Sequence, residues 1–236
     1  MHLFKKNELL KIGHRGAPTL CHENTINSFL KAIEAGLKGI ELDVQLTLDK
    51  KLIVYHDWYI KINPNKKIKI ENILYSEINN DRNENCKIPL LIDVLNILPN
   101  DCIKIIEIKS KYISNTKIEY QILKIINEYN IEDSTIISSF NPFILYRIKS
   151  LKSNIQTAFL WTKKQSQLIF NTPLWIWFCR PDGFHVDIKF LDIYLVNWAR
   201  NNNLSVMAYT IINQLQLDKA KKLKIDGIFV DDPYLN

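Results

Sequence analysis

The sequence predicts an α/β protein folded as a (β/α)₈ barrel of the TIM type, with an added β-hairpin and a short excursion over the barrel mouth. Short runs of β-branched residues alternate along the chain with segments whose apolar residues recur at helical spacing, which indicates a mostly parallel sheet. The length of 236 residues suits one barrel with a full core. We therefore expect residues 1–236 to form a single domain.

The first helix and the strand after it can be predicted from local signals. Apolar residues recur at helical spacing after Thr25, whose hydroxyl suits an N-cap, and Gly36 can close the helix in the left-handed conformation. The apolar run from Gly39 to Leu46 follows as a strand. Further strands are expected at 102–109, 134–138, 154–160, 183–187, 204–210 and 226–230, and further helices at 117–129, 142–150, 190–202 and 213–223.

The hairpin is predicted from one connection, residues 46–52, which is far too short for the crossover that parallel neighbours require. The strands on either side of it are therefore expected to pair antiparallel. A two-residue turn at Asp49 and Lys50 would set a register in which His56 lies opposite Asp43. Directly opposed residues have Cβ atoms about 4.5–5.5 Å apart. The hairpin would thus bring a histidine beside a carboxylate.

Two segments depart from the alternating pattern. Residues 58–88 are rich in Lys, Asn and Ile with weak periodicity, and we expect them to form the excursion over the barrel mouth. Trp175, Trp177 and Phe178, followed by Arg180, suit either a tip that touches a membrane or a segment packed on the barrel. We favour the packed segment.

Three acidic side chains stand at strand ends. Glu41 and Asp43 are two residues apart on one strand, so their side chains share a face, and Glu107 lies near the end of another strand. Three carboxylates in one place repel each other unless a cation holds them, and a set of oxygen ligands selects a hard ion, Mg²⁺ or Ca²⁺. A single such residue is more often an ordinary solvated acid, and a carboxylate pair can also serve a glycosidase.

Two histidines and two permanent cations accompany the carboxylates. His14 and Arg15 follow the first strand, His56 follows the hairpin, and Lys109 lies two residues beyond Glu107. Phosphodiester cleavage needs a base, an acid and positive charge near the non-bridging oxygens. Histidine suits both proton roles because its unperturbed pKa is about 6.5. A lone histidine is more often structural, whereas two of them beside charged motif residues favour catalysis.

The order of the motifs resembles the glycerophosphodiester phosphodiesterase family, bacterial cytosolic type. The motifs are His14-Arg15-Gly16, Glu23-Asn24-Thr25, Glu41-Leu42-Asp43, Thr47-Leu48-Asp49, His56-Asp57 and Glu107-Ile108-Lys109, with weaker matches from Ser138-Ser139-Phe140 to Asp232-Pro233. The resemblance spans almost the whole chain. It implies a barrel that hydrolyses glycerophosphodiesters to glycerol 3-phosphate and an alcohol, with a divalent metal ion as cofactor.

The resemblance also implies a role for each candidate residue. These roles are an acid/base pair (His14, His56), phosphate contacts (Arg15, Lys109), metal ligands (Glu41, Asp43, Glu107) and two further positions in the substrate pocket (His185, Tyr209). For His185 a packing role is an equal alternative. Ile62-Asn63 stands where many members have Arg-Thr, a departure that bears on the choice of head group.

Charge and cysteine content limit the partners and the compartment. The net charge of +6 comes from lysines spread along the chain without a recognition motif, so we expect a small-molecule substrate and no nucleic acid. The four cysteines form no C-x-x-C pair and the N-terminus lacks the apolar core of a signal peptide, which favours the cytoplasm. No run reaches the roughly 18 apolar residues of a membrane span, so no stable membrane insertion is expected.

Two other functions stay open at this stage. One is a phospholipase-D-like enzyme that acts on intact lipids, although such relatives usually bring secretion and disulfide-bonded loops. The other is a barrel that binds phosphodiesters without turnover. Loss of activity normally removes acid, base or ligand positions first, and the retained carboxylates and histidines favour the enzyme. The oligomeric state is left open by the sequence.

Overall fold

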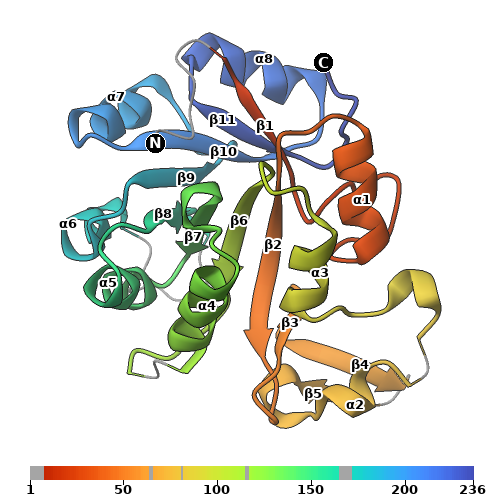
Figure 1. Ribbon diagram of the computed structural model, residues 1–236. Helices are drawn as coiled ribbons and strands as arrows, with labels where there is room; N and C mark the ends of the chain where they lie inside the picture. Colours follow the sequence, from red (N-terminus) through yellow and green to blue (C-terminus); the bar gives the residue numbers. More distant parts are fainter. Residues whose placement is uncertain (1–7, 64–65, 81, 115–116, 165–171) are drawn as a thin grey trace.

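The computed structural model describes residues 8–63, 66–80, 82–114, 117–164 and 172–236, and within them eight parallel strands close into a barrel (Figure 1). β1 pairs with both β2 and β11, which closes the sheet. The strands are β1 (Leu10–Gly13), β2 (Gly39–Leu46), β6 (Ile103–Ile108), β7 (Thr135–Ser139), β8 (Gln156–Trp161), β9 (Gly183–Asp187), β10 (Ser205–Ile211) and β11 (Gly227–Val230). The predicted barrel is confirmed.

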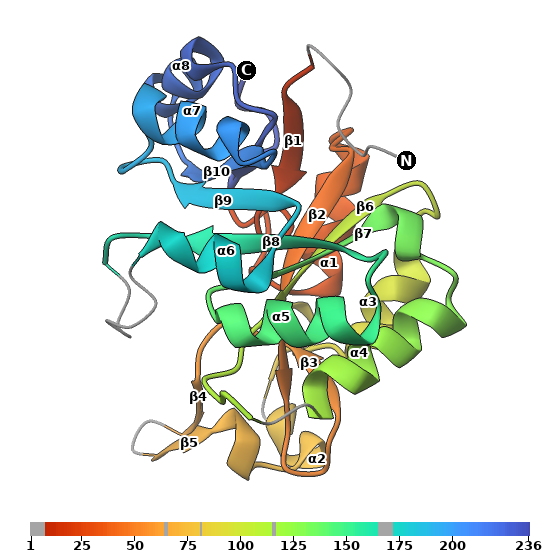
Figure 2. The same cartoon turned by 90° about the vertical axis from the view of Figure 1, so that its left-hand side faces the viewer.

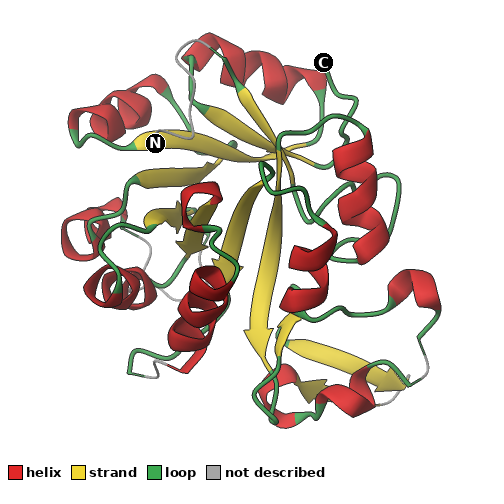
Figure 3. Cartoon of the chain, in the orientation of Figure 1, coloured by secondary structure: helices red, strands yellow, loops and turns green. Residues whose placement is uncertain are grey.

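Helices cover the outside of the sheet (Figure 3). They are α1 (Ile26–Glu34), α3 (Leu91–Ile97), α4 (Lys117–Glu128), α5 (Pro142–Leu151), α6 (Ile176–Cys179), α7 (Ile193–Asn201) and α8 (Gln214–Leu223). Side chains of Thr25, Asn141, Asp192 and Asn213 accept a backbone N–H at the start of α1, α5, α7 and α8, as N-caps do. Thr25 and the left-handed Gly36 therefore bound the first helix region as predicted.

Apolar side chains fill the interior of the barrel below its carboxyl end. Ile12, Ile105, Ile136, Met207 and Phe229 belong to one buried cluster inside the sheet. Side chains alternate between the two faces of a strand, so the inward positions that come next toward the carboxyl end belong to polar residues. The packed interior thus forms a rigid floor beneath the carboxylates and histidines.

The hairpin forms, but the predicted register is wrong by one residue. β3 (Leu52–Val54) pairs antiparallel with β2, with Val44 opposite Val54 and Leu46 opposite Leu52. The reason is a wider turn than the two-residue turn predicted. Thr47 N–H donates to Lys51 O at 3.0 Å, and Thr47 Oγ1 accepts the Lys51 N–H at 2.9 Å.

This register moves His56 out of the predicted pairing with Asp43. β3 ends at Val54, and the backbone N–H of Tyr55 is the group that donates to Asp43 O, at 2.9 Å. His56 follows in an extended segment at the barrel mouth. The histidine still lies near enough to Asp43 for the two side chains to interact electrostatically.

The excursion is confirmed and holds its own small core. β4 (Tyr59–Asn63) and β5 (Lys66–Lys69) form an antiparallel ribbon, and α2 (Tyr75–Ile78) follows, near the carboxyl end of β2 and the hairpin turn (Figures 1 and 2). Its buried isoleucines, packed under the ribbon, are Ile53, Ile60, Ile70, Ile73, Ile78 and Ile88. The weak sequence periodicity concealed this ribbon because, among its described side chains, Ile60 is buried, Ile62 and Ile68 are half-buried and the others are exposed.

The aromatic segment between β8 and β9 packs on α5, as favoured from the sequence. The Phe178 ring lies 4.7 Å from that of Tyr146 and 5.0 Å from that of Phe143, between centroids. Trp177 is exposed, and its indole N–H donates to Asn202. Among the described residues there is no helix of the length and apolarity needed to cross a membrane.

Replacement of Lys50 by glycine should stabilise the protein. Lys50 has φ of +63°, and the left-handed conformation costs a non-glycine residue about 1–2 kcal/mol. That exceeds the roughly 0.5–1 kcal/mol entropic cost of glycine. We expect Lys50→Gly to raise the free energy of unfolding in urea by about 0.5–1 kcal/mol. Lys51→Gly, at a position without positive φ, is the control and should lower it.

Candidate active site

The loop after β1 is held in place by the start of helix α1. Gly16, at φ +93°, lies so close to Ser28 that a Cβ atom would come within 2.4 Å of Ser28 Oγ. The Ser28 hydroxyl donates to Arg15 O at 3.0 Å and accepts the Ala17 N–H at 2.8 Å. His14 and Arg15 are therefore presented by a backbone that the helix fixes at three points.

Each residue of the Glu23-Asn24-Thr25 motif contacts a different element near the site. Glu23 accepts two hydrogen bonds from Arg15 Nη1, at 2.9 and 3.0 Å. Asn24 Nδ2 donates to Asp43 Oδ2 at 2.9 Å, and Thr25 caps α1. Sequence analysis recognised this motif but gave its residues no role in the site. The motif thus ties the first loop, the helix and strand β2 together.

Glu41, Asp43 and Glu107 meet at the carboxyl ends of β2 and β6. One ligand atom from each lies within 4.8 Å of those of the other two. Asp43 stands opposite Glu107 in the parallel pairing of the two strands, which brings their side chains side by side. The structure therefore brings together the three carboxylates that the sequence predicts.

Two cations neutralise part of this acidic cluster. Lys109 Nζ lies 3.2 Å from Glu107 Oε1 and 3.4 Å from Asp43 Oδ1. Arg15 Nε lies 3.3 Å from Asp43 Oδ2, and the Arg15 backbone N–H donates to Glu41 Oε2 at 3.0 Å. Burial opposes the charge on Arg15 and on Lys109, but the surrounding carboxylates outweigh it and raise the pKa of both groups.

The three carboxyl groups differ in how readily they ionise. Burial disfavours the charged form of Asp43, but the charges of Lys109 and Arg15 outweigh it and lower its pKa to about 2. Burial, together with the charge on Asp43, raises the pKa of Glu41 well above its ordinary value. Burial likewise raises the pKa of Glu107, against the opposing charge of Lys109. The cluster carries more negative potential than its two cations offset.

The donor set fits a hard divalent cation. Asp43 Oδ1 is buried and accepts no hydrogen bond from the described residues. A buried carboxylate oxygen without a donor is costly, and oxygen ligands from several carboxylates are what Mg²⁺ and Ca²⁺ select. Glu41, Asp43 and Glu107 are the residues that would hold such an ion. Its charge would remove the repulsion that keeps Glu41 from ionising.

Both histidines are oriented by an adjacent carboxylate. His14 Nδ1 lies 2.7 Å from Asp231 Oδ1, and His56 Nδ1 lies 2.9 Å from Asp57 Oδ1. With the Nδ1–H donated to a carboxylate, Nε2 is left free to exchange a proton. Sequence analysis missed Asp231, although its position directly after a predicted strand end is the signal shared by the other site residues.

A cavity of about 390 Å³ opens beside the acidic cluster. His14, His56, Arg15, Glu41 and Glu107 all line it. Its remaining walls include Ser138, Phe140, Leu160, Asp187, Lys189, Tyr209 and Phe229. Charged and proton-exchanging groups thus face one enclosed space with an apolar wall, which is the composition of a small-molecule site.

Tyr209 and His185, both expected in the substrate pocket, occupy different places in the barrel. Tyr209 lines the cavity, and its hydroxyl donates to Trp161 O at 2.9 Å. His185 instead lies in the barrel interior on β9, 1% exposed, with its ring 5.1 Å from that of Phe229 and no hydrogen-bond partner among the described residues. Burial lowers the pKa of His185 to about 3, so the ring is neutral. This position fits the packing alternative.

Replacement of Glu41 by glutamine should stabilise the protein in the absence of divalent ions. The change removes a buried carboxyl group that resists ionisation but keeps an acceptor for the Arg15 N–H. In chelator, we expect the variant to have a higher Tm than the wild type. The rise should correspond to about 1 kcal/mol in the free energy of unfolding at the midpoint. Addition of Mg²⁺ or Ca²⁺ should raise the Tm of the wild type but not that of the variant.

Glu34→Gln, on the exposed side of α1, is the matched control. Its side chain is 61% exposed, and the substitution should change neither the chelated nor the ion-loaded Tm by more than a degree or two. An equal ion-induced rise in wild type and Glu41→Gln would show that Glu41 is not a ligand.

Comparison with known proteins identifies the family of the chain. The model of the glycerophosphoryl diester phosphodiesterase family matches residues 14–235. A glycerophosphodiester phosphodiesterase of Caldanaerobacter subterraneus subsp. tengcongensis is 31% identical over 95% of this chain and 94% of its own.

Solved structures share the fold over nearly their whole length. The glycerophosphodiester phosphodiesterase of Thermotoga maritima superposes with a TM-score of 0.77 at 27% identity, covering 97% of both chains. An Oleispira antarctica phosphodiesterase, solved in complex with the product sn-glycerol-3-phosphate, gives 0.81 at 22% identity over 95% of this chain and 93% of its own. The chain therefore belongs to the glycerophosphoryl diester phosphodiesterase family.

Proposed function

We propose that the protein is an enzyme that hydrolyses glycerophosphodiesters to glycerol 3-phosphate and an alcohol, with Mg²⁺ or Ca²⁺ as cofactor. One observation carries this proposal: two carboxylate-oriented histidines and a cluster of three carboxylates line the same cavity. The family match and the relatives named for this activity support the substrate class. The relative solved with sn-glycerol-3-phosphate supports glycerol phosphate as the common half of the substrates.

The histidines would carry the protons. Asp231 and Asp57 hold the Nδ1–H of His14 and His56, so each Nε2 can accept a proton from an attacking oxygen or donate one to a leaving oxygen. One histidine acts as the base and the other as the acid in the first step. Because each ring is fixed by its carboxylate, neither has to reorient during the reaction.

Arg15 and Lys109 would bind the phosphate. Both lie within 3.5 Å of the buried carboxylate of Asp43, which holds their charged groups at the edge of the cluster. A phosphodiester carries one negative charge, and charge builds up on its non-bridging oxygens as an oxygen attacks. When bound, the divalent ion supplies Lewis-acid polarisation of a phosphate oxygen.

Glu41, Asp43 and Glu107 are the proposed ligands of this ion. Tyr209 is proposed to contact substrate through the apolar wall of the cavity, while the position of His185 supports a packing role. The proposed compartment is the cytoplasm, a reducing setting that suits four free cysteines.

Divalent ions should be required for turnover. Purified protein would be incubated with glycerophosphocholine, glycerophosphoethanolamine, glycerophosphoglycerol and an intact lysolipid, and the products identified by mass. We expect glycerol 3-phosphate from the deacylated substrates when Mg²⁺ or Ca²⁺ is present and none in excess chelator. Full activity in chelator would contradict the metal assignment. Cleavage of the lysolipid alone would favour a phospholipase-D-like activity.

Loss of either histidine should abolish most of the activity. We expect His14→Ala and His56→Ala to lower kcat by roughly 10²–10⁴-fold, the usual effect of removing a positioned proton carrier. The two losses should not add in the double variant if both act in one transition state. His22→Ala, at an exposed position, is the control and should change kcat less than about threefold. Unchanged Tm values would exclude a loss through misfolding.

A further inference from the structure

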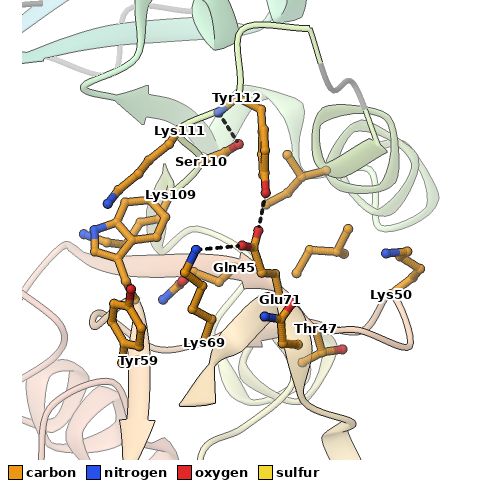
Figure 4. A pocket seen from close by; sticks show the side chains of 14 residues that line it. Gln45, Thr47, Lys50, Tyr59, Lys69, Glu71, Lys109, Ser110, Lys111 and Tyr112 are labelled. Carbon is orange, nitrogen blue, oxygen red and sulfur yellow. Dashed lines mark hydrogen bonds and ion pairs between the residues drawn. The ribbon is translucent and has the colours of Figure 1, made fainter. Parts of the chain in front are cut away.

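A second cavity, of about 520 Å³, adjoins the active site on the side of the excursion (Figure 4). It lies between the outer end of β2, the β4–β5 ribbon and the segment that follows β6. Gln45 and Thr47 line it and continue the face of β2 that carries Asp43. Lys109 lines it too, although its Nζ contacts Glu107 in the acidic cluster. The second cavity therefore begins at the proposed phosphate-binding lysine.

The lining of the second cavity is positively charged. Four lysines line it, namely Lys50, Lys69, Lys109 and Lys111, against one carboxylate among its described lining residues, Glu71. That carboxylate is already engaged, because Tyr112 Oη donates to Glu71 Oε2 at 2.6 Å and Lys69 Nζ lies 3.5 Å from Oε1. Figure 4 shows this link running across the cavity from Tyr112 through Glu71 to Lys69. An anion entering the cavity meets net positive charge.

Trp58 makes the cavity unfavourable for a cationic group. An open tryptophan face attracts quaternary ammonium groups such as choline. Here Lys111 Nζ lies 4.6 Å and Lys109 Nζ 5.8 Å from the centroid of the Trp58 ring. The ring already faces two ammonium groups, and a third cation would meet like charge. The aromatic surface is left to stack against uncharged parts of a ligand.

The chemistry of the cavity indicates the head group of the substrate. We propose that it binds the leaving alcohol of the glycerophosphodiester, and that it favours a polyol that carries a second phosphate. Its lysines suit the phosphate, and Asn72 and Ser110 supply uncharged polar groups for hydroxyls. Its volume lies within the roughly 300–1,000 Å³ of small-molecule sites and exceeds the needs of ethanolamine.

This inference rests on the proposed function, because it takes the scissile phosphate to lie at Arg15 and Lys109. The glycerol half, which is common to all such substrates, then occupies the cavity lined by both histidines. The variable half extends past Lys109 along the face of β2. Lys109 of the second cavity contacts Glu107 of the first, so the two cavities lie on either side of this pair and match the two arms of a diester.

The test compares three substrates in saturating Mg²⁺: bis(glycerophospho)glycerol, glycerophosphoglycerol and glycerophosphocholine. The first two share a glycerol leaving group and differ by the second glycerophosphate unit, which carries the second phosphate. We expect kcat/KM to fall in the order given, with about a tenfold advantage for the second phosphate after allowance for its two equivalent scissile bonds. Equal values for the first two, or a preference for choline, would overturn the head-group inference.

Substitution of lysines that line the second cavity tests whether this cavity causes the preference for the second phosphate. Lys111→Met and Lys50→Met should each lower kcat/KM for bis(glycerophospho)glycerol about tenfold and change the value for glycerophosphoglycerol less than threefold. Lys66→Met is the control, because Lys66 is an exposed lysine of the β4–β5 ribbon that lies outside the cavity lining, and it should leave both values unchanged. Equal losses on both substrates in the cavity variants would overturn the inference. Failure of the wild type to cleave any of the three would instead refute the proposed function itself.

Discussion

The site depends on one buried carboxylate, that of Asp43. The residue is fully buried, and its oxygens lie beside Arg15 from the first loop, Asn24 from the segment before α1, and Lys109 from the end of β6. An unpaired charge at this depth would be unstable, so each of these elements is held where its side chain can reach Asp43. Because the partners come from three separate segments, the same interaction that satisfies the charge also assembles the active site.

The cations around Asp43 have a second effect on the neighbouring acids. They outweigh the burial of Asp43 itself, whereas burial, together with the charge on Asp43, raises the pKa values of Glu41 and Glu107. Holding these acids close together costs free energy. A divalent ion that binds between them can recover that free energy. A divalent ion bound between Glu41, Asp43 and Glu107 would offset the burial and repulsion that raise the pKa values of the two glutamates. The apolar floor of the barrel prevents the cluster from relaxing by moving apart.

Most of the fold and most of the residues that meet at the candidate site could be predicted from the sequence, because strand ends and helix caps leave local signals. The alternation of elements, the cap at Thr25 and the carboxylates on β2 and β6 are of this kind. The hairpin register was wrong because the Thr47 hydroxyl closes a wider turn, a choice that depends on hydrogen bonds rather than on residue pattern. The depth of His185 could not be predicted either, since an inward position on a strand lies at the mouth or in the floor according to the stagger of its neighbours.

The excursion lies on the same side of the barrel as β2 and lines part of the second cavity. A (β/α)₈ barrel needs only a short connection after β2, yet this chain inserts a ribbon with its own core of isoleucines before α3. That core includes Ile53 of β3, which joins the excursion to the hairpin, and the excursion supplies Lys69, Glu71 and Asn72 to the lining of the second cavity. His56 and Trp58, only two residues apart, line the first and second cavities respectively. The residue proposed as a proton carrier and a residue of the proposed head-group site therefore belong to one short stretch of backbone.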